Sequence, residues 1–370
     1  MSNDDLFEAT RLTRAGRLTE ATDLLQRMLQ GHAAPVSPEP RESHGEGLGT
    51  TLKEALQGLW QRVRHAGDHD EAPTPAAESL PEGARWLEGS FASAAGSRSY
   101  RLYVPSGHRG QPAPLLVMLH GCTQSPEDFA AGTRMNALAE EHGFLVVYPA
   151  QAAAANPQRC WNWFSPDDQQ RDRGEPSLIA GIARQVMAEH AVDPTRVYVA
   201  GLSAGGAAAA IMGATYPDLF AAVGVHSGLG CGAASDLPSA FAAMRQGAAS
   251  SGRLAVPTIV FHGDQDTTVN PKNGEQVAGQ ARAAAGPGLR RELETGRAPG
   301  GRPFSRTRDL DVSGRAVVEQ WTVHGGGHAW SGGSPAGSYT DPQGPDAGAA
   351  MLRFFLEHRN PAAVRAYEAF

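Results

Sequence analysis

The pentapeptide Gly201-Leu202-Ser203-Ala204-Gly205 decides the fold of this chain, because of the residues on either side of it. The preceding run Arg196-Val197-Tyr198-Val199-Ala200 is β-branched and aromatic, and it predicts a buried strand. The following stretch, residues 206–215, is rich in alanine and predicts a helix. Ser203 therefore sits on a tight strand-to-helix turn, whose flanking glycines leave the space that a Cβ atom would fill.

A serine on such a turn is the nucleophile elbow of the α/β-hydrolases. The helix behind it points its first N–H groups at the place where negative charge would develop during acyl transfer. Because the chain has 44 glycines, a pentapeptide of this kind also arises by chance. The prediction that Ser203 is a nucleophile therefore depends on its companions, which follow in the order acid and then histidine in this fold.

Two aspartates are candidates for the acid. The core strand predicted at residues 257–261 runs into a loop that holds Asp264 and Asp266. A carboxylate at the carboxyl end of a parallel strand is well placed to orient a histidine. Periodicity does not separate the two aspartates, and either is also explained as a turn-capping residue.

Two histidines are candidates for the base. A strand predicted at residues 317–323 is followed by His324, three glycines and His328. Chain order and the glycine-flanked loop favour His328, whereas His324 lies at the strand end and is the structural alternative.

The oxyanion donors are expected in two loops. The apolar run of residues 115–119 enters His120-Gly121-Cys122, at the point where this fold places its oxyanion loop. We expect the backbone N–H groups of Cys122 and Ala204 to hold the oxyanion, and no metal or organic cofactor is needed for this chemistry.

These motifs together resemble the esterases of the polyhydroxybutyrate depolymerase type, which are related to feruloyl and acetylxylan esterases. The resemblance covers residues 101–358. It is carried by Leu119-His120-Gly121-Cys122-Thr123-Gln124, Cys160-Trp161-Asn162-Trp163-Phe164, Gly201 to Gly206, Tyr216-Pro217-Asp218, His262-Gly263 through Val269, and Gly326-Gly327-His328-Ala329-Trp330.

The resemblance implies Ser203 as nucleophile, Asp266 as the acid and His328 as base. It prefers Asp266 to Asp264 because the family pattern has two residues between His-Gly and the aspartate. It also places cysteines in these loops, so one bridge, Cys160 with Cys231 or Cys122 with Cys160, is the alternative to three separate thiols. A reducing cytosol argues against a bridge.

Composition excludes several classes of protein. The formal net charge of −7 does not favour nucleic acid, and no apolar run is long enough to span a membrane. The acidic start of the chain lacks a secretory signal pattern, so we expect a cytoplasmic location. Neither an export signal nor a polymer-binding module is recognised, which argues against crystalline extracellular polyester as the substrate.

The chain divides into three parts. Residues 1–31 predict a helical hairpin, residues 32–81 a largely irregular linker, and residues 82–370 a catalytic α/β-hydrolase domain with a doubly wound, mostly parallel sheet. A helix is expected over residues 126–141, and an insertion or mobile flap over residues 286–308. We interpret the hairpin as an arm that docks on its own or a neighbouring subunit in a homodimer; attachment to a polyester granule is the alternative.

Tryptophans near the motifs suggest a substrate pocket. Trp161 and Trp163 lie in a polar loop and Trp330 follows the base by two residues, so all three are candidates to wall the pocket. The alternative is that they anchor their loops to the sheet.

The predicted activity is hydrolysis of short-chain 3-hydroxyacid esters or polyhydroxybutyrate-type oligomers by a Ser-His-Asp mechanism. Feruloyl or acetylxylan ester hydrolysis is the second hypothesis, and peptidase activity is a lesser one. A non-catalytic hydrolase-fold binding protein is the alternative from a different class, and it would be marked by a broken triad.

Overall fold

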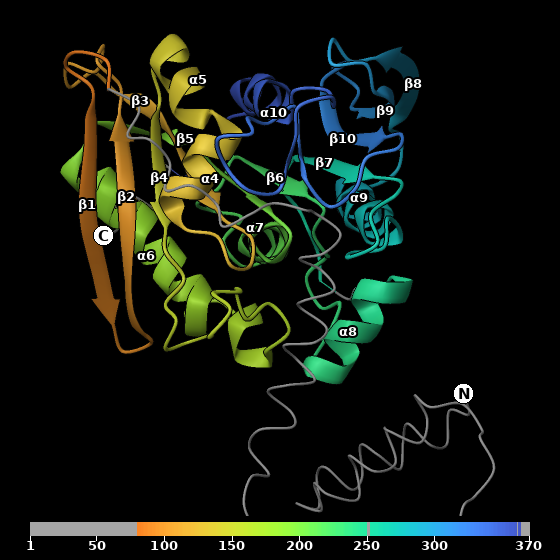
Figure 1. The fold of residues 1–370 in the computed structure, drawn as a ribbon, viewed down its shortest axis with the longest axis horizontal. Helices are drawn as coiled ribbons and strands as arrows, with labels where there is room; N and C mark the ends of the chain where they lie inside the picture. The colour runs from red at the N-terminus through yellow and green to blue at the C-terminus, as the bar shows by residue number, and fades with distance from the viewer. Residues whose placement is uncertain (1–79, 250–251, 361, 364–370) are drawn as a thin grey trace, which may run out of the picture. The chain divides into compact units, whose positions relative to one another are not determined.

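The computed structural model describes residues 80–249, 252–360 and 362–363. The predicted hairpin of residues 1–31 and the linker up to residue 79 lie outside the described residues. Within the described part, ten strands form one sheet in the spatial order β1-β2-β4-β3-β5-β6-β7-β10-β9-β8 (Figure 1).

The sheet is parallel in its centre and antiparallel at both edges. Parallel pairing joins β4, β3, β5, β6, β7 and β10, and antiparallel pairing adds β1 and β2 at one edge and β9 and β8 at the other. This confirms the predicted mostly parallel sheet. The strands are β1 (Arg85–Ser93), β2 (Gly96–Val104), β3 (Ala113–Leu119), β4 (Leu145–Pro149), β5 (Val192–Leu202), β6 (Ala222–His226), β7 (Thr258–Gly263), β8 (Arg290–Arg297), β9 (Pro303–Leu310) and β10 (Ala316–Val323).

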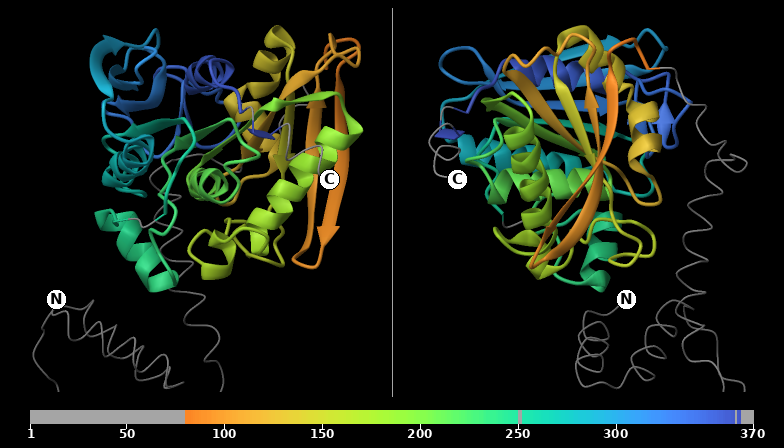
Figure 2. Two further views of the ribbon diagram at one scale, coloured as in Figure 1. Left: turned by 180° about the vertical axis from the view of Figure 1, so that it is seen from behind. Right: turned by 90° about the vertical axis from the view of Figure 1, so that its left-hand side faces the viewer.

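Helices cover both faces of the sheet, as a doubly wound topology requires (Figure 2). One face carries α4 (Pro126–Thr133), α5 (Met135–His142) and α10 (Ala347–Leu356). The opposite face carries α6 (Gly174–Glu189), α7 (Ala204–Thr215) and α9 (Lys272–Ala285), with α8 (Leu237–Gln246) beside α9. The shorter elements are η1 (Pro166–Gln169), β11 (Trp330–Ser331) and β12 (Thr340–Asp341).

Burial explains why the central elements have the sequences they have. All seven residues of β3 are buried, which matches its continuous apolar run, because a central parallel strand is covered on both faces. The residues of α7 from Ala204 to Gly213 are all buried too. Their small side chains let this helix lie close to β5 and β6, directly behind the predicted nucleophile.

Two expectations about secondary structure are wrong. The helix expected over residues 126–141 is two helices, because Arg134 between them adopts a left-handed conformation with φ 54°. The flap expected over residues 286–308 is instead the hairpin β8–β9, which extends the sheet. Ion pairs across the hairpin, such as Arg308 Nη2 to Glu292 Oε2 at 2.8 Å, stabilise strands that have little apolar content.

Among the described residues, no helix is both long and apolar enough to cross a membrane.

Candidate active site

Ser203 occupies a strained turn between β5 and α7. Its backbone has φ 57° and ψ −118°, a conformation that is costly for a residue with a side chain. The glycines of the motif explain how the turn is made. A Cβ at Gly201 would overlap the carbonyl of Gly205, and a Cβ at Gly205 would overlap the carbonyl of Leu119. The sharp turn therefore requires glycine at both flanking positions.

The carboxylate of Asp266 contacts the imidazole of His328. The Asp266 Oδ2 to His328 Nδ1 distance is 2.7 Å, and the residues come from the loops after β7 and β10, 62 residues apart in the chain. The other oxygen, Oδ1, accepts the backbone N–H groups of Thr268 and Val269 at 2.9 and 2.8 Å. Since Asp266 is held by this turn, its side chain is fixed toward His328.

The environment of Asp266 favours its ionised form. Its side chain is fully buried, and burial alone would raise the pKa of the carboxyl. The imidazoles of His328 and His262 outweigh burial and hold the pKa of Asp266 well below its ordinary value. His262 Nε2 lies 3.4 Å from Asp266 Oδ2 and 2.8 Å from the carbonyl oxygen of Val269. A charged Asp266 can orient His328 with its proton on Nδ1.

Asp264 and His324, the alternative candidates for the acid and the base, pair with each other. Asp264 Oδ2 lies 2.8 Å from His324 Nδ1, so each aspartate of the β7 loop has its own histidine in the β10 loop. The Asp264 and His324 side chains are 34% and 39% exposed, whereas those of Asp266 and His328 are 0% and 12% exposed. The buried pair contains His328, the histidine that follows the three glycines.

His226 joins the serine turn to the loop of His328, and the sequence analysis did not single it out. The Ser203 N–H donates to the His226 carbonyl oxygen at 2.9 Å, and the Ser331 N–H donates to His226 Nε2 at 2.9 Å. Burial lowers the pKa of His226 to about 3, with smaller effects of nearby histidines, so its ring is neutral. Among the described residues, the Ser203 hydroxyl makes no hydrogen bond to His328. Their two loops are instead connected through His226, which accepts N–H groups from both.

The predicted oxyanion loop lies directly against Ser203. A Cβ at Gly121 would be 3.7 Å from Cβ of Ser203, and Gln124 Oε1 accepts the N–H of Gly121 at 2.9 Å. In the part of the chain that the structure describes, the N–H groups of Cys122 and Ala204 donate to no protein acceptor. Both N–H groups are therefore free to donate to an oxyanion, and their role in the reaction stays a prediction.

A disulfide ties the oxyanion loop to the neighbouring loop. Cys122 is bonded to Cys160, and Cys231 is a free, buried thiol whose pKa burial raises to about 11. Of the pairings left open by the sequence, the structure therefore has Cys122 with Cys160. The Thr123 N–H also donates to the carbonyl of Gln158 at 2.7 Å, so the two loops are joined by more than the disulfide.

The tryptophans proposed as pocket walls lie mostly in the core. Trp161 is 0% exposed and donates its ring N–H to the His120 carbonyl oxygen at 3.1 Å. Trp330 is 1% exposed and stacks on His226 with ring centroids 5.1 Å apart. These contacts explain both rings as anchors of their loops and leave them little surface for substrate. Trp163 is 7% exposed and packs edge-on against Phe164.

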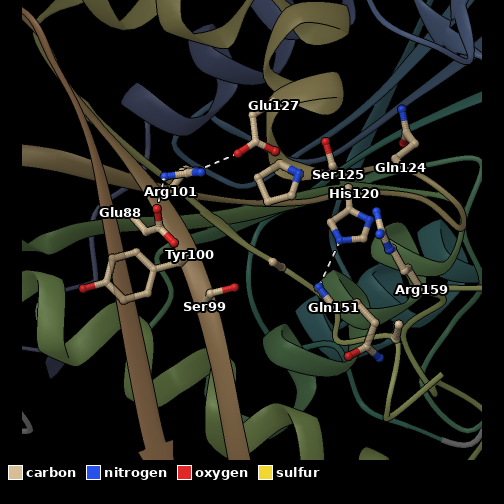
Figure 3. Close-up of a pocket in the computed structure, with 13 residues that line it drawn as sticks. Glu88, Ser99, Tyr100, Arg101, His120, Gln124, Ser125, Glu127, Gln151 and Arg159 are labelled. Atoms are coloured by element: carbon tan, nitrogen blue, oxygen red, sulfur yellow. Dashed lines mark hydrogen bonds and ion pairs between the residues drawn. The ribbon is translucent and has the colours of Figure 1, made fainter. Parts of the chain in front are cut away.

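A cavity of about 290 Å³ lies beside the oxyanion loop but contains none of the three predicted catalytic residues (Figure 3). His120 and Gln124 line it from the loop, and Arg101 spans it to pair with Glu88 and Glu127. Burial lowers the pKa of His120 to about 4, and its Nε2 accepts the N–H of Gln151 at 3.1 Å. The Arg101–Glu127 ion pair joins β2 to α4, and the contact of His120 with Gln151 joins the oxyanion loop to the segment after β4.

The model of the family described as "Esterase PHB depolymerase" matches residues 98–295, which is more than half of the chain. The chain belongs to this family. The matched region of the PHB depolymerase esterase model includes Ser203 and both aspartates, and His328 lies beyond its end. The family resemblance in the sequence motifs is thereby confirmed.

Relatives of this chain include proteins named for different esters. It is 35% identical over 254 residues to poly(3-hydroxyalkanoate) depolymerase C of Paucimonas lemoignei, covering 65% of this chain and 60% of that protein. It is 29% identical over 220 residues to feruloyl esterase B of Thermothelomyces thermophilus, covering 54% of this chain and 74% of that protein. The chain thus spans less than two thirds of the length of depolymerase C.

A solved structure shares the fold. The acetyl xylan esterase from Aspergillus awamori matches 73% of this chain and 99% of its own, with a TM-score of 0.56 and 20% sequence identity. This likeness supports the α/β-hydrolase fold of the chain, and at this identity it indicates the fold alone.

Proposed function

We propose that this protein is a serine carboxylic ester hydrolase in which Ser203, His328 and Asp266 are the catalytic residues. The observation that carries the proposal is the 2.7 Å contact between the Asp266 carboxylate and His328 Nδ1, in loops joined through His226 to the strained turn of Ser203. A conformation as costly as that of Ser203 is kept where the surrounding structure maintains it, and such positions concentrate at functional sites.

The proposed reaction has two halves. Ser203 Oγ attacks the ester carbonyl while His328 Nε2 takes its proton and passes it to the leaving alcohol, and Asp266 stabilises the resulting imidazolium. The N–H groups of Cys122 and Ala204 hold the oxyanion of the tetrahedral intermediate. Water then cleaves the acyl-enzyme by the same route. A serine-to-histidine hydrogen bond that is absent before substrate binds is common, because such bonds tighten in the substrate complex.

The test of this mechanism is replacement of the serine. Ser203→Ala should lower kcat on p-nitrophenyl butyrate by about 10⁶-fold, as for other serine hydrolases. Ser313→Ala, in the exposed turn between β9 and β10 at the opposite end of β10 from the His328 loop, is the matched control and should leave turnover unchanged. Substantial turnover by Ser203→Ala would contradict the mechanism. A fluorophosphonate probe that leaves the wild-type protein unlabelled would instead support the non-catalytic binding protein.

Short-chain 3-hydroxyacid esters, including soluble oligomers or amorphous polyester, are the proposed substrates. The support is the 35% identity to a protein named for poly(3-hydroxyalkanoate). Feruloyl or acetylxylan esters are the second candidate, supported by relatives named for those esters. A panel of hydroxybutyrate oligomers, methyl ferulate and acetylated xylan tests the choice, and a kcat/KM highest for methyl ferulate or for acetylated xylan would reject the first candidate.

The cytoplasmic location and the contact of the N-terminal hairpin with a granule or second subunit stay predictions. The disulfide between Cys122 and Cys160 weighs against the location, because cytosolic thiols are kept reduced. Fractionation of cells with an antibody against the protein, combined with thiol alkylation before lysis, would report both the compartment and the state of this pair.

A further inference from the structure

A second hydrogen-bonded triad of serine, histidine and aspartate (Ser305, His324 and Asp264) lies beside the proposed active site. Ser305 Oγ is 2.8 Å from His324 Nε2, and His324 Nδ1 is 2.8 Å from Asp264 Oδ2. The other carboxylate oxygen, Asp264 Oδ1, accepts the Gly325 N–H at 2.7 Å. The same three residue types thus follow one another through hydrogen bonds in the order that activates a serine.

The direction of these bonds follows from the chemistry of the groups. An ionised carboxylate only accepts, so Nδ1 of His324 carries the proton that faces Asp264. In the neutral ring Nε2 is then unprotonated, and the hydrogen bond to it comes from the Ser305 hydroxyl. His324 therefore faces Ser305 as a base.

The histidine and aspartate of this second triad are more exposed to solvent than His328 and Asp266. The His324 and Asp264 side chains are 39% and 34% exposed, and Ser305 is partly exposed. Ser305 lies in β9, where it pairs with Thr322 of β10 and Thr295 of β8. A small reagent in water can approach these groups without a rearrangement of the core.

We propose that Ser305 is a second acylation site, which reacts with small activated carboxylic esters and with fluorophosphonates. In the reaction with an ester, a bond forms between Ser305 Oγ and the carbonyl carbon, and the hydroxyl proton moves to His324 Nε2. The bond from that carbon to the leaving oxygen then breaks, and the leaving group takes the proton from His324. The products are an ester of Ser305 and the free alcohol. With a fluorophosphonate, a bond forms between Ser305 Oγ and phosphorus, the phosphorus–fluorine bond breaks, and fluoride leaves with the proton from His324 as hydrogen fluoride.

Acylation of Ser305 is slow compared with that of Ser203. Ser203 precedes helix α7 and faces two available N–H donors, whereas Ser305 is inside a strand with neighbours on both sides. Loss of one oxyanion donor alone lowers a rate by about 10²–10³-fold. Ser305 should therefore react at least about 10³-fold more slowly than Ser203. Hydrolysis of the Ser305 ester is slowed by the same lack of oxyanion donors, so the modified serine persists long enough to be detected.

A purely structural role makes a different prediction. Asp264 and its neighbours also bridge the loops after β7 and β10, since the Asp264 N–H donates to the Val323 carbonyl at 3.1 Å and the Gln265 N–H to that of Gly326 at 2.9 Å. If Asp264 and His324 serve only this contact, Ser305 is no more reactive than any other surface serine.

The experiment uses the full-length Ser203→Ala protein, so that the first site does not dominate. It is incubated with p-nitrophenyl acetate or a fluorophosphonate, digested, and the rate of modification is measured by mass spectrometry at Ser305 and at Ser313. Ser313 is the internal control, because its hydroxyl donates to an Asp311 carboxylate oxygen at 2.6 Å and, among the described residues, hydrogen-bonds to no imidazole. We expect Ser305 to be modified at least tenfold faster than Ser313.

Adding His324→Gln keeps the Ser305 hydroxyl but removes the base, and should abolish this excess. Asp264→Asn is the second variant if the glutamine variant folds poorly, and it should reduce the excess. Equal rates at Ser305 and Ser313, or an undiminished rate at Ser305 in folded His324→Gln, would overturn the proposal. Labelling of Ser203 is read from a parallel digest of the wild-type protein, so a failure at Ser305 is distinguished from a failure of the proposed function.

Discussion

Replacing Asp266 by asparagine removes one charge from a fully buried carboxylate and changes almost nothing in shape. The side-chain oxygen of the new asparagine can still accept the N–H groups of Thr268 and Val269, which in the wild-type protein bond to Oδ1. Its amide NH₂ must then take the place of Oδ2, facing His328 Nδ1. Because that amide donates, His328 would have to accept at Nδ1 and carry its proton on Nε2, where it cannot take the proton of Ser203.

We therefore expect a large loss of catalytic activity in a variant that keeps its fold. A wrong tautomer at this position lowers kcat by about 10⁴-fold in the serine protease triad. At 1.36 kcal/mol for each factor of ten, this is about 5 kcal/mol of transition-state stabilisation. His262 adds to the effect, since its Nε2 also lies 3.4 Å from the oxygen that becomes NH₂.

The same change at Asp264 is the matched control. That carboxylate holds a different histidine, His324, and is 34% exposed. Asp264→Asn should therefore lower turnover of p-nitrophenyl butyrate less than tenfold, while Asp266→Asn lowers it about 10⁴-fold. Circular dichroism checks that both variants are folded. If Asp264→Asn is the more damaging of the two, the assignment of the acid is refuted.

The pH dependence of stability has a definite sign. The pKa of Asp266 is lower in the folded protein than its ordinary value of 3.8, so ionised Asp266 stabilises the folded state above that pH. The difference in urea midpoint between wild type and Asp266→Asn should be present in full above about pH 4 and shrink as the pH falls below it. A difference that grows as the pH falls below about 4 would contradict the charge pairing.

Two further predictions concern stability. Replacing Cys122 and Cys160 together by serine opens a link that spans 38 residues, so the free energy of unfolding from urea titration should fall by about 4 kcal/mol, and an unchanged midpoint would show that the pair is not bonded. Gly205→Ala should cost about 3 kcal/mol or more because its Cβ overlaps the Leu119 carbonyl. Gly279→Ala, whose Cβ in α9 would meet nothing nearer than Arg282 Nη2 at 4.0 Å, should be neutral or stabilise by about 0.5–1 kcal/mol, and equal losses in thermal melts would contradict the steric argument.

The fold was predictable where hydrophobic patterning is strong. The buried runs of β3 and β5 and the turn at Ser203 are visible in the sequence, because central parallel strands need apolar residues on both faces. The hairpin β8–β9 was missed for the converse reason. Its residues are mostly arginine, glutamate and threonine, and the pairing that stabilises them, as between Glu292 and Arg308, joins residues that are 16 apart in the chain. A local pattern does not record that pairing.

The sequence predicted which loops carry the candidate site, but spacing alone did not decide between the two aspartates or between the two histidines. Asp264 and Asp266 lie on the same short turn, as do His324 and His328 on theirs, and the two loops hold the pairs side by side. Spacing within each loop is compatible with either partner. The family motif favoured Asp266, and the structure adds an independent physical reason, since only Asp266 is fully buried between two imidazoles and held at Oδ1 by two backbone N–H groups.

Burial also bears on the three tryptophans, whose role as walls of a substrate pocket stays a prediction. An aromatic residue close to a motif looks the same in sequence whether it walls a pocket or anchors the loop that carries the motif. Trp330 stacks on His226, which in turn stacks on Phe261 of β7 with ring centroids 5.7 Å apart. This column fixes the loop just after His328 to the ends of β6 and β7. Placement of His328, the proposed base, thus depends on aromatic packing next to its loop, which a motif in the sequence does not reveal.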